Sequence, residues 1–118
     1  MNREWVRRYC LSLPHVTEQV QWQIDLVFKI GGKMFAIVVL EPHATCLGFK
    51  CSPEDFEELI ERPGVIPAPY IARAKWVAPE SFDAIPRKDL EQRLKKAYQL
   101  IFAKLPKKAQ RELVKQEH

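Results

Sequence analysis

The sequence lacks an apolar run long enough to cross a lipid bilayer. The longest, Met34–Leu40, is far shorter than the roughly 20 residues that a membrane-spanning helix needs. Three arginines lie near the N-terminus, but neither an apolar stretch nor a small-residue cleavage site follows them, so no secretory signal is predicted. We therefore expect a cytoplasmic protein without a membrane segment.

Cysteine is scarce, and the three cysteines, Cys10, Cys46 and Cys51, are odd in number. A chain of 118 residues can bury a sufficient core without disulfides, so reduced thiols are expected. A zinc site formed by His43, Cys46 and Cys51 is not favoured, because positions five apart on one extended strand point to opposite faces. We expect the chain to need no metal and no cofactor.

Motifs for catalysis are missing as well. The histidines, His15, His43 and His118, fall in predicted loops or at the C-terminus, and no motif sets one beside a nucleophile and a carboxylate. Gly31-Gly32 joins two predicted strands and opens no helix, which excludes the glycine-rich phosphate loop of nucleotide-binding enzymes. The sequence therefore predicts that the protein is not an enzyme.

The residues that are present match an ordinary globular protein. Hydrophobic residues make up 47% and charged residues 29% of the chain, and neither an internal repeat nor a linker divides it, so residues 1–118 are expected to form one domain. The charge is uneven: residues 86–118 hold ten Lys or Arg and four Asp or Glu, whereas residues 54–62 hold five acids and one arginine. A basic C-terminal third suits a polyanion, although a solvated helix face would explain it too.

In the first half of the chain, the pattern predicts a helix followed by a β-meander. Helical spacing covers residues 3–13, with Asn2 as the N-cap and Pro14 as the stop. Residues 15–24 are polar and are expected to form a loop. Alternating apolar residues then predict three antiparallel strands, the first two joined by a tight turn at Gly31-Gly32. The predicted strands cover residues 26–30, 34–40 and 45–50.

The second half predicts helices around an irregular, proline-rich segment. Ser52 caps a short helix that ends before Pro63-Gly64, and a longer helix runs from Arg87 to Pro106 with Arg93, Lys95 and Lys96 on its outer face. Residues 65–80 are expected to hold a turn or short helix near Tyr70 and a strand near Trp76, and residues 109–114 a last helix. The expected core consists of Phe28, Phe35, Ile37, Leu47, Phe49, Leu94, Tyr98 and Ile101.

This order of elements, together with several short motifs, resembles the MmcQ/YjbR family over nearly the whole chain. The motifs are Phe28-Lys29-Ile30, Gly32-Lys33-Met34-Phe35-Ala36, Phe49-Lys50-Cys51-Ser52-Pro53-Glu54, Pro67-Ala68-Pro69-Tyr70, Ala74-Lys75-Trp76-Val77, Ala97-Tyr98 and Leu105-Pro106. The resemblance implies an α+β fold similar to that of CyaY and frataxin, with helices packed on an antiparallel sheet made of a meander and an additional strand. It also implies DNA binding through basic β-hairpin wings.

Iron binding of the frataxin kind is disfavoured, because it would need an acidic first helix. Here that helix carries Arg3, Arg7 and Arg8 against Glu4 alone.

Binding to a nucleic acid needs cations that replace phosphate counterions and planar groups that stack on bases. Six residues of these types could share one surface: Lys29, Lys33, Lys50, Arg73, Lys75 and Trp76. The structural alternative is that the three strand lysines are simply solvated and that Trp76 belongs to the core, as large aromatic residues usually do.

A second functional hypothesis is a module that binds a small ligand or a protein in a groove near Tyr70 and Trp76. Pro67 and Pro69 would hold such a groove rigid at little entropic cost. The prolines would equally serve to lock a long connection over the sheet. Salt dependence separates the two functions, because binding to a polyanion weakens steeply with salt and binding in an apolar groove does not.

Overall fold

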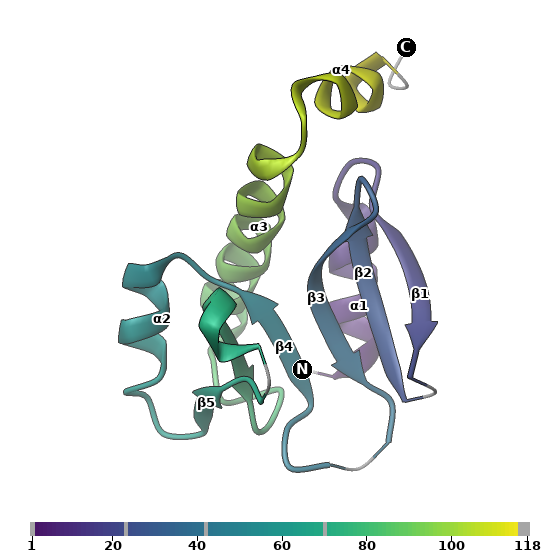
Figure 1. Ribbon diagram of the computed structural model, residues 1–118. Coiled ribbons are helices and arrows are strands. Elements are labelled where there is room, and N and C mark those ends of the chain that lie inside the picture. Colours follow the sequence, from purple (N-terminus) through teal and green to yellow (C-terminus); the bar gives the residue numbers. More distant parts are fainter. Residues whose placement is uncertain (1, 23, 42, 70, 116–118) are drawn as a thin grey trace.

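The computed structural model describes residues 2–22, 24–41, 43–69 and 71–115. Within these ranges, six antiparallel strands in the order β1-β2-β3-β4-β6-β5 form one sheet (Figure 1). The strands are β1 Thr17–Gln21, β2 Asp25–Ile30, β3 Lys33–Val39, β4 Leu47–Lys50, β5 Val65–Pro67 and β6 Trp76–Pro79. The helices are α1 Arg3–Ser12, α2 Pro53–Leu59, the short 3-10 helix η1 Ala72–Ala74, α3 Arg87–Lys104 and α4 Lys107–Lys115. The predicted α+β fold is confirmed.

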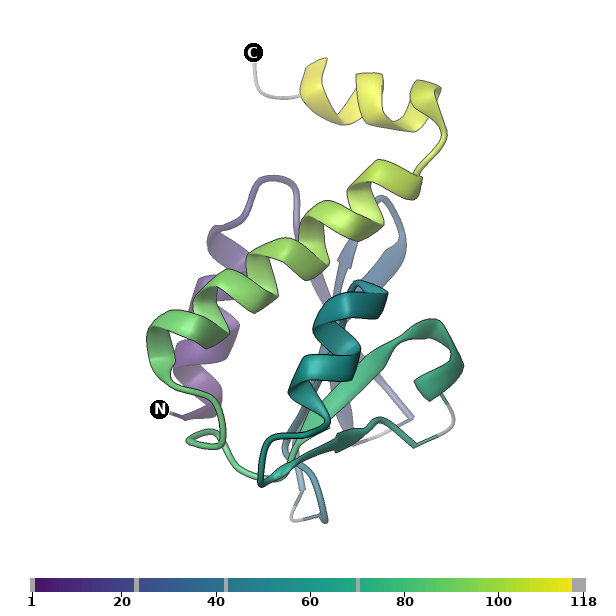
Figure 2. The ribbon, with the colours of Figure 1, turned by 90° about the vertical axis from the view of Figure 1, so that its left-hand side faces the viewer.

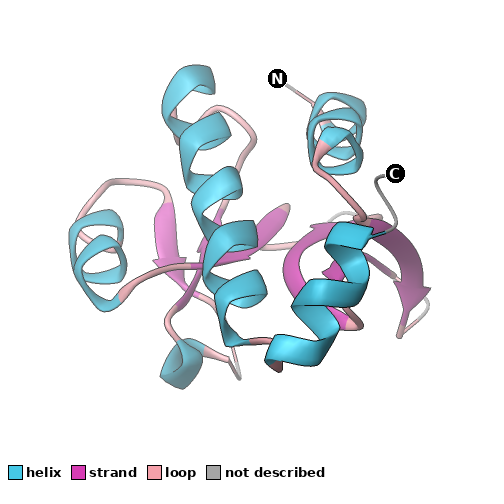
Figure 3. Cartoon of the chain, turned by 90° about the horizontal axis from the view of Figure 1, so that it is seen from above, coloured by secondary structure: helices cyan, strands magenta, loops and turns pink. Residues whose placement is uncertain are grey.

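The two faces of the sheet are covered differently. Helices α1 and α3 pack on one face, and the connection that contains η1 lies on the other (Figures 2 and 3). The main core is between the sheet and the helices, and its largest fully buried side chains include Phe28, Phe35, Phe49, Leu90 and Leu94. The smaller outer cluster consists of Ala68, Trp76 and Ala78, with Met34, Ile37, Ile66 and Ile71 packed against it.

The helix starts follow from local sequence, as predicted. The Oδ1 atom of Asn2 accepts a hydrogen bond from the Trp5 amide at 2.9 Å, which caps α1. The Oγ atom of Ser52 accepts one from the Asp55 amide at 3.2 Å, and Pro53 takes the first position of α2. Because proline lacks an amide hydrogen and disfavours helix in the residue before it, α3 ends ahead of Pro106.

Strand β1 corrects the prediction that residues 15–24 form a loop. Its residues pair with β2, with Thr17 opposite Lys29 and Gln21 opposite Asp25. The strand lies at the edge of the sheet and most of its side chains are exposed, so it does not show the apolar alternation of a half-buried strand. Trp22 follows it with a φ of 54° and is 64% exposed.

Strand β5 was also not predicted, because it ends in a proline. Pro67 lies on the strand at the other edge of the sheet, where a missing amide hydrogen costs no ladder bond on the open side. Its partner β6 confirms the strand predicted near Trp76.

A β-bulge corrects the predicted position of Ile37. Phe28 pairs with Ala36 while Lys29 pairs with Met34, so Phe35 is an extra residue in β3. The extra residue breaks the alternation of faces that predicted Phe35 and Ile37 on the same side. Phe35 is fully buried in the main core, as predicted, whereas Ile37 packs against the outer cluster.

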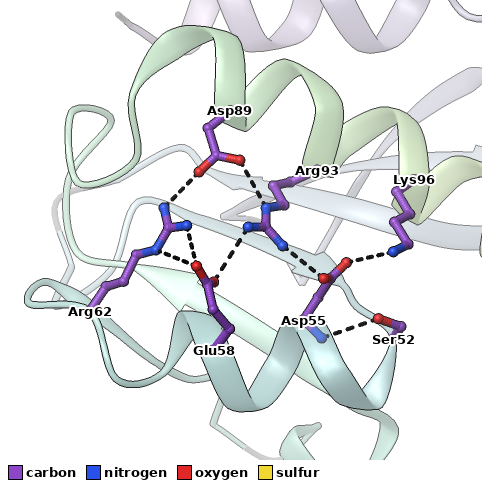
Figure 4. Close-up of polar contacts among 7 residues, drawn as sticks. All are labelled: Ser52, Asp55, Glu58, Arg62, Asp89, Arg93 and Lys96. Carbon is purple, nitrogen blue, oxygen red and sulfur yellow. Dashed lines mark hydrogen bonds and ion pairs between the residues drawn. The ribbon is translucent and has the colours of Figure 1, made fainter.

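A network of charged side chains joins α2 to α3 (Figure 4). Arg93 contacts three carboxylates: Nη1 lies 2.9 Å from Asp55, Nη2 3.4 Å from Glu58 and Nε 3.0 Å from Asp89. Its side chain is only 16% exposed, so the prediction that Arg93 lies on the outer face of this helix is wrong. The helix turns this residue toward α2 because the acids there supply counter-charges that a buried guanidinium requires.

Two further cations complete this network. Lys96 lies 3.0 Å from Asp55, and Arg62, just after α2, contacts both Glu58 and Asp89. Part of the basic C-terminal third is therefore neutralised by the acidic segment, which removes these residues from any surface free to bind a polyanion.

Candidate functional site

Lysines from separate elements converge at the end of the sheet where β3 begins. A groove of about 330 Å³ lies there, between the first residues of β3 and β6 and the end of α3. It is lined by Lys33, Met34, Trp76, Ile101, Lys104, Leu105 and Pro106. Lys50 and Lys75 do not line it, but the charge of Lys50 lies close enough to those of Lys104 and Lys75 for the three to interact. We call the groove with the four lysines Lys33, Lys50, Lys75 and Lys104 the lysine groove.

The hairpin turn brings the end of α3 next to Lys33. Gly31 and Gly32 have φ values of 59° and 81°, which suits the tight turn between β2 and β3. Leu105 packs directly on Gly31, since a Cβ built on that glycine would lie 2.6 Å from Cδ1 of Leu105. Lys104 and Lys33 therefore flank the same groove.

Lys50 is the buried member of the lysine groove. It is 8% exposed, lies opposite Trp76 in the pairing of β4 with β6, and donates a hydrogen bond to the carbonyl of Ala74. Burial lowers the pKa of Lys50, and the charges of Lys104 and Lys75 lower it further. The prediction that Lys50 faces away from Leu47 and Phe49 is consistent with this position, but the side chain is enclosed and not solvated.

Lys75 is held by the turn that follows η1. Its φ is 63°, and its carbonyl accepts a hydrogen bond from the Cys51 amide at 2.8 Å, which ties the turn to the end of β4. The Nζ atom lies 5.0 Å from the centroid of the Phe56 ring, close enough for a cation–π contact. The aromatic ring stabilises the ammonium without neutralising its charge.

The four lysines have no acidic partners among the described residues. No described carboxylate forms an ion pair with Lys33, Lys50, Lys75 or Lys104, in contrast to the network around Arg93. A cluster of cations with one buried member repels itself, and an anion placed among them would relieve that repulsion. The groove can therefore bind a phosphate or another anion.

The other predicted residues either do not line this groove or serve another role. Lys29 donates a hydrogen bond to Gln19 of β1 at 3.0 Å, and Arg73 is exposed on η1. Trp76 lines the groove but is only 4% exposed, so the alternative interpretation of this residue as core is confirmed. Tyr70 lies outside the described residues.

Sequence reasoning missed Lys104. It ends α3 and was visible only as one of many basic residues in the C-terminal third. The sequence signal that could have found it is the Leu105-Pro106 motif, which fixes the place where the helix stops.

Neither metal ligation nor a membrane segment is indicated by the described parts of the chain. Within them, no three or more His, Cys, Asp or Glu side chains are grouped so that they could hold a metal ion. The helices of the same ranges are too short or too polar to cross a membrane.

Comparison with known proteins places this fold in a family. The family model described as YjbR matches residues 11–100. A crystal structure of a Deinococcus radiodurans protein with the family domain DUF419 is similar with a TM-score of 0.83 and 28% sequence identity, over 93% of this chain and 86% of that protein. A Pseudomonas syringae protein shares the fold with a TM-score of 0.69 and 18% identity, over 85% and 98% of the two chains. No curated protein matches the sequence. The narrower likeness to CyaY and frataxin stays a prediction, but the chain belongs to the YjbR family.

Proposed function

We propose that this protein is a non-enzymatic, cytoplasmic DNA-binding protein that holds the phosphate backbone in the lysine groove. The observation that carries the proposal is the convergence of four lysines, from β3, β4, the turn after η1 and α3, without a carboxylate partner in the described chain. Lysines that serve only solubility are scattered over the surface and are often paired with carboxylates. These four lysines are clustered and have no carboxylate partner among the described residues.

The energetic argument concerns Lys50. Its ammonium is enclosed and lies close to two other cations, so the charged form is costly in the free protein. A phosphate in the groove would favour that charged form and raise its pKa again. Part of the binding free energy would thus come from relief of the repulsion between Lys50 and the neighbouring lysines. The rest would come from the release of counterions from the DNA.

An extended polyanion fits better than a single small anion. Helix α4 starts directly beyond Pro106 and carries the exposed cations Lys107, Lys108, Arg111 and Lys115 (Figure 1). These residues add positive charge immediately beyond Pro106, which lines the groove. A duplex backbone would reach both regions, whereas a lone phosphate would occupy only the groove.

Contacts of this kind position DNA and do not read its sequence. Trp76, the planar residue expected to stack on bases, is buried in the outer cluster. Lysines that contact phosphates carry no base information. We therefore expect similar affinity for unrelated duplexes of the same length.

The test is fluorescence anisotropy with two unrelated labelled duplexes at several salt concentrations. If four phosphates are neutralised, the association constant should fall about 150-fold between 50 and 200 mM salt. The Lys75→Gln and Lys104→Gln variants should each flatten the slope of log affinity against log salt by about one unit. Lys95→Gln is the matched control, because Lys95 is an exposed lysine on α3 outside the groove.

Three results would contradict the proposal. The first is no salt-dependent binding of the unmodified protein to duplex or single-stranded DNA at low ionic strength. The second is equal slopes for Lys104→Gln and Lys95→Gln, which would attribute binding to total charge and not to the groove. The third is a large preference between the two duplexes, which would require base contacts.

A further inference from the structure

A second cavity lies on the outer face of the sheet, away from the lysine groove. It has a volume of about 200 Å³. Its floor includes Ile37, Val39, Gly48 and Ala78 of the central strands, and Ala68, Pro69 and Ile71 of the connection between β5 and β6 form a wall. The end of β3 contributes to this cavity, whereas the start of β3 contributes Lys33 to the lysine groove. The two sites are therefore separate.

The cavity owes part of its space to a glycine in a central strand. Gly48 lies in β4 and is buried. A Cβ built on it would meet the Val77 carbonyl at 3.7 Å and Cε3 of Trp76 at 3.9 Å, both ordinary contact distances. Alanine would thus fit, and packing does not require the glycine. Glycine inside a strand is destabilising and often marks a place where a ligand approaches the backbone closely.

One carboxylate stands at the edge of this otherwise mostly apolar cavity. Asp25, the first residue of β2, lines it together with His43 and Thr45 from the loop between β3 and β4. Burial raises the pKa of Asp25, and the nearby charge of His43 opposes that rise. No described lysine or arginine forms an ion pair with this carboxylate, so its oxygens can accept hydrogen bonds from a ligand.

We propose that this cavity binds a small organic cation, a primary amine carried on an aromatic ring or a branched aliphatic group. The apolar walls would take the ring, and the Asp25 carboxylate would accept hydrogen bonds from the ammonium. The size fits, because an apolar cavity of about 150 Å³ holds benzene, and the remaining volume accommodates a one-carbon arm. Charge complementarity selects an amine over a carboxylic acid, since an acid would bring a second negative charge beside Asp25.

The test uses the full chain and three matched probes, benzylamine, benzyl alcohol and benzoate, in a ¹H–¹⁵N NMR titration at pH 8. Benzylamine should cause saturable shifts at the amides of Ile37, Gly48 and Ala78, with a dissociation constant on the order of 1 mM. Benzyl alcohol should bind about tenfold more weakly, because a hydrogen bond between charged groups is stronger than a neutral one. Benzoate should not bind there.

Two variants and one control tie the result to the cavity. Asp25→Asn should abolish the preference for the amine over the alcohol, while the melting temperature changes little. Glu41→Gln is the control, because it removes an exposed carboxylate outside the cavity and should leave the preference intact. Gly48→Ala should weaken all binding several-fold without lowering the melting temperature, since the added methyl occupies the cavity and alanine suits a strand better than glycine. Unsaturated shifts, equal binding of amine and benzoate, or an unchanged preference in Asp25→Asn would overturn the proposal.

Discussion

Replacing Arg93 with methionine should loosen the attachment of α2 to α3. Arg93 contacts Asp55, Glu58 and Asp89, and its side chain is 16% exposed. Isolated exposed ion pairs contribute 0 to about 1 kcal/mol, whereas loss of one partner of a fully buried pair costs about 3–5 kcal/mol. Asp55 and Asp89 are themselves 21% and 27% exposed, and Glu58 is 48% exposed, so the network lies between these limits. We expect a loss of about 2 kcal/mol.

Methionine is chosen because it keeps the apolar stem and removes only the charge. The measurement is urea denaturation followed by circular dichroism, with Lys95→Met as a control for the loss of one charge on α3. Asp89→Asn and the double variant complete a thermodynamic cycle, which should give a coupling of about 1 kcal/mol between the two residues. If Arg93→Met and Lys95→Met destabilise equally, the network does not hold the helices together.

Acid titration provides a second readout of the same network. Burial raises the pKa of Asp89, but hydrogen bonds from Arg62 and Arg93 lower it more, so the net value is below the ordinary 3.8. The pKa of Asp55 is also lowered overall, because burial raises it less than the hydrogen bond from Lys96 and the charge of Arg93 lower it. A lowered folded-state pKa adds stability that is complete above 3.8 and is lost as the pH falls through the folded value. The stability of Arg93→Met should therefore depend less on pH below about 4.

Further predictions concern the core, the cysteines and Lys50. Phe35→Ala should cost about 3–5 kcal/mol, since the ring is fully buried and lies edge-on to Tyr98 at 5.7 Å; a loss below 1 kcal/mol in urea denaturation would place the bulge elsewhere. Trp76→Ala should likewise lower the melting temperature by several degrees, and an unchanged value would mean that the ring is not part of the core. Burial raises the pKa of the thiols of Cys10 and Cys51 to about 12, and burial likewise raises that of Cys46 to about 11. Iodoacetamide at pH 8 should thus label the folded protein far more slowly than the unfolded chain, and chelator or reductant should leave melting unchanged; rapid labelling would show that the thiols are accessible. Because the folded-state pKa of Lys50 is lowered, stability should rise as the pH increases from that value toward 10.5. Lys50→Met should lack this rise, and identical pH profiles for the two proteins would refute the assignment.

Local signals in the sequence were sufficient for most of the elements. Capping by Asn2 and Ser52, the stop at Pro106 and the turn at Gly31-Gly32 each act within a few residues, so the pattern alone predicts them. The two edge strands were missed for different reasons: Pro67 argued against β5, and β1 lacks the apolar alternation of a half-buried strand. An edge strand such as β1 is stabilised by its partner's backbone, which leaves few marks on its own side chains.

The direction of single side chains was harder to predict where one residue shifts the register. Because Phe35 is an extra residue, side chains before and after it in β3 no longer follow one alternation between the two faces of the sheet. The residue types in this strand do not predict the bulge. The sequence placed Arg93 on the solvent-facing side of α3, because helical spacing shows which residues share a face but not which other element packs against that face. Only the packing of α2 against α3 shows that its charge is paired.

The candidate site depends partly on residue types, which the sequence shows, and partly on tertiary packing, which it does not show. The residue types at Lys33, Lys50 and Lys75 predicted a cation-rich surface, but their convergence with Lys104 depends on how α3 packs against the sheet. The spacing of these lysines along the chain contains no information on that arrangement. Lys29 and Arg73 fit the same residue pattern, yet they do not line the groove.

The contact of Leu105 with Gly31 also has a consequence for the order of folding. It joins a hairpin turn near the start of the chain to the end of its longest helix. Hairpins and helices form within microseconds, whereas contacts between distant segments must first overcome the entropy of closing a long loop. We therefore expect the lysine groove to appear only in the last cooperative step. A nascent chain that has not yet released α3 from the ribosome would therefore hold the β2–β3 turn and no groove.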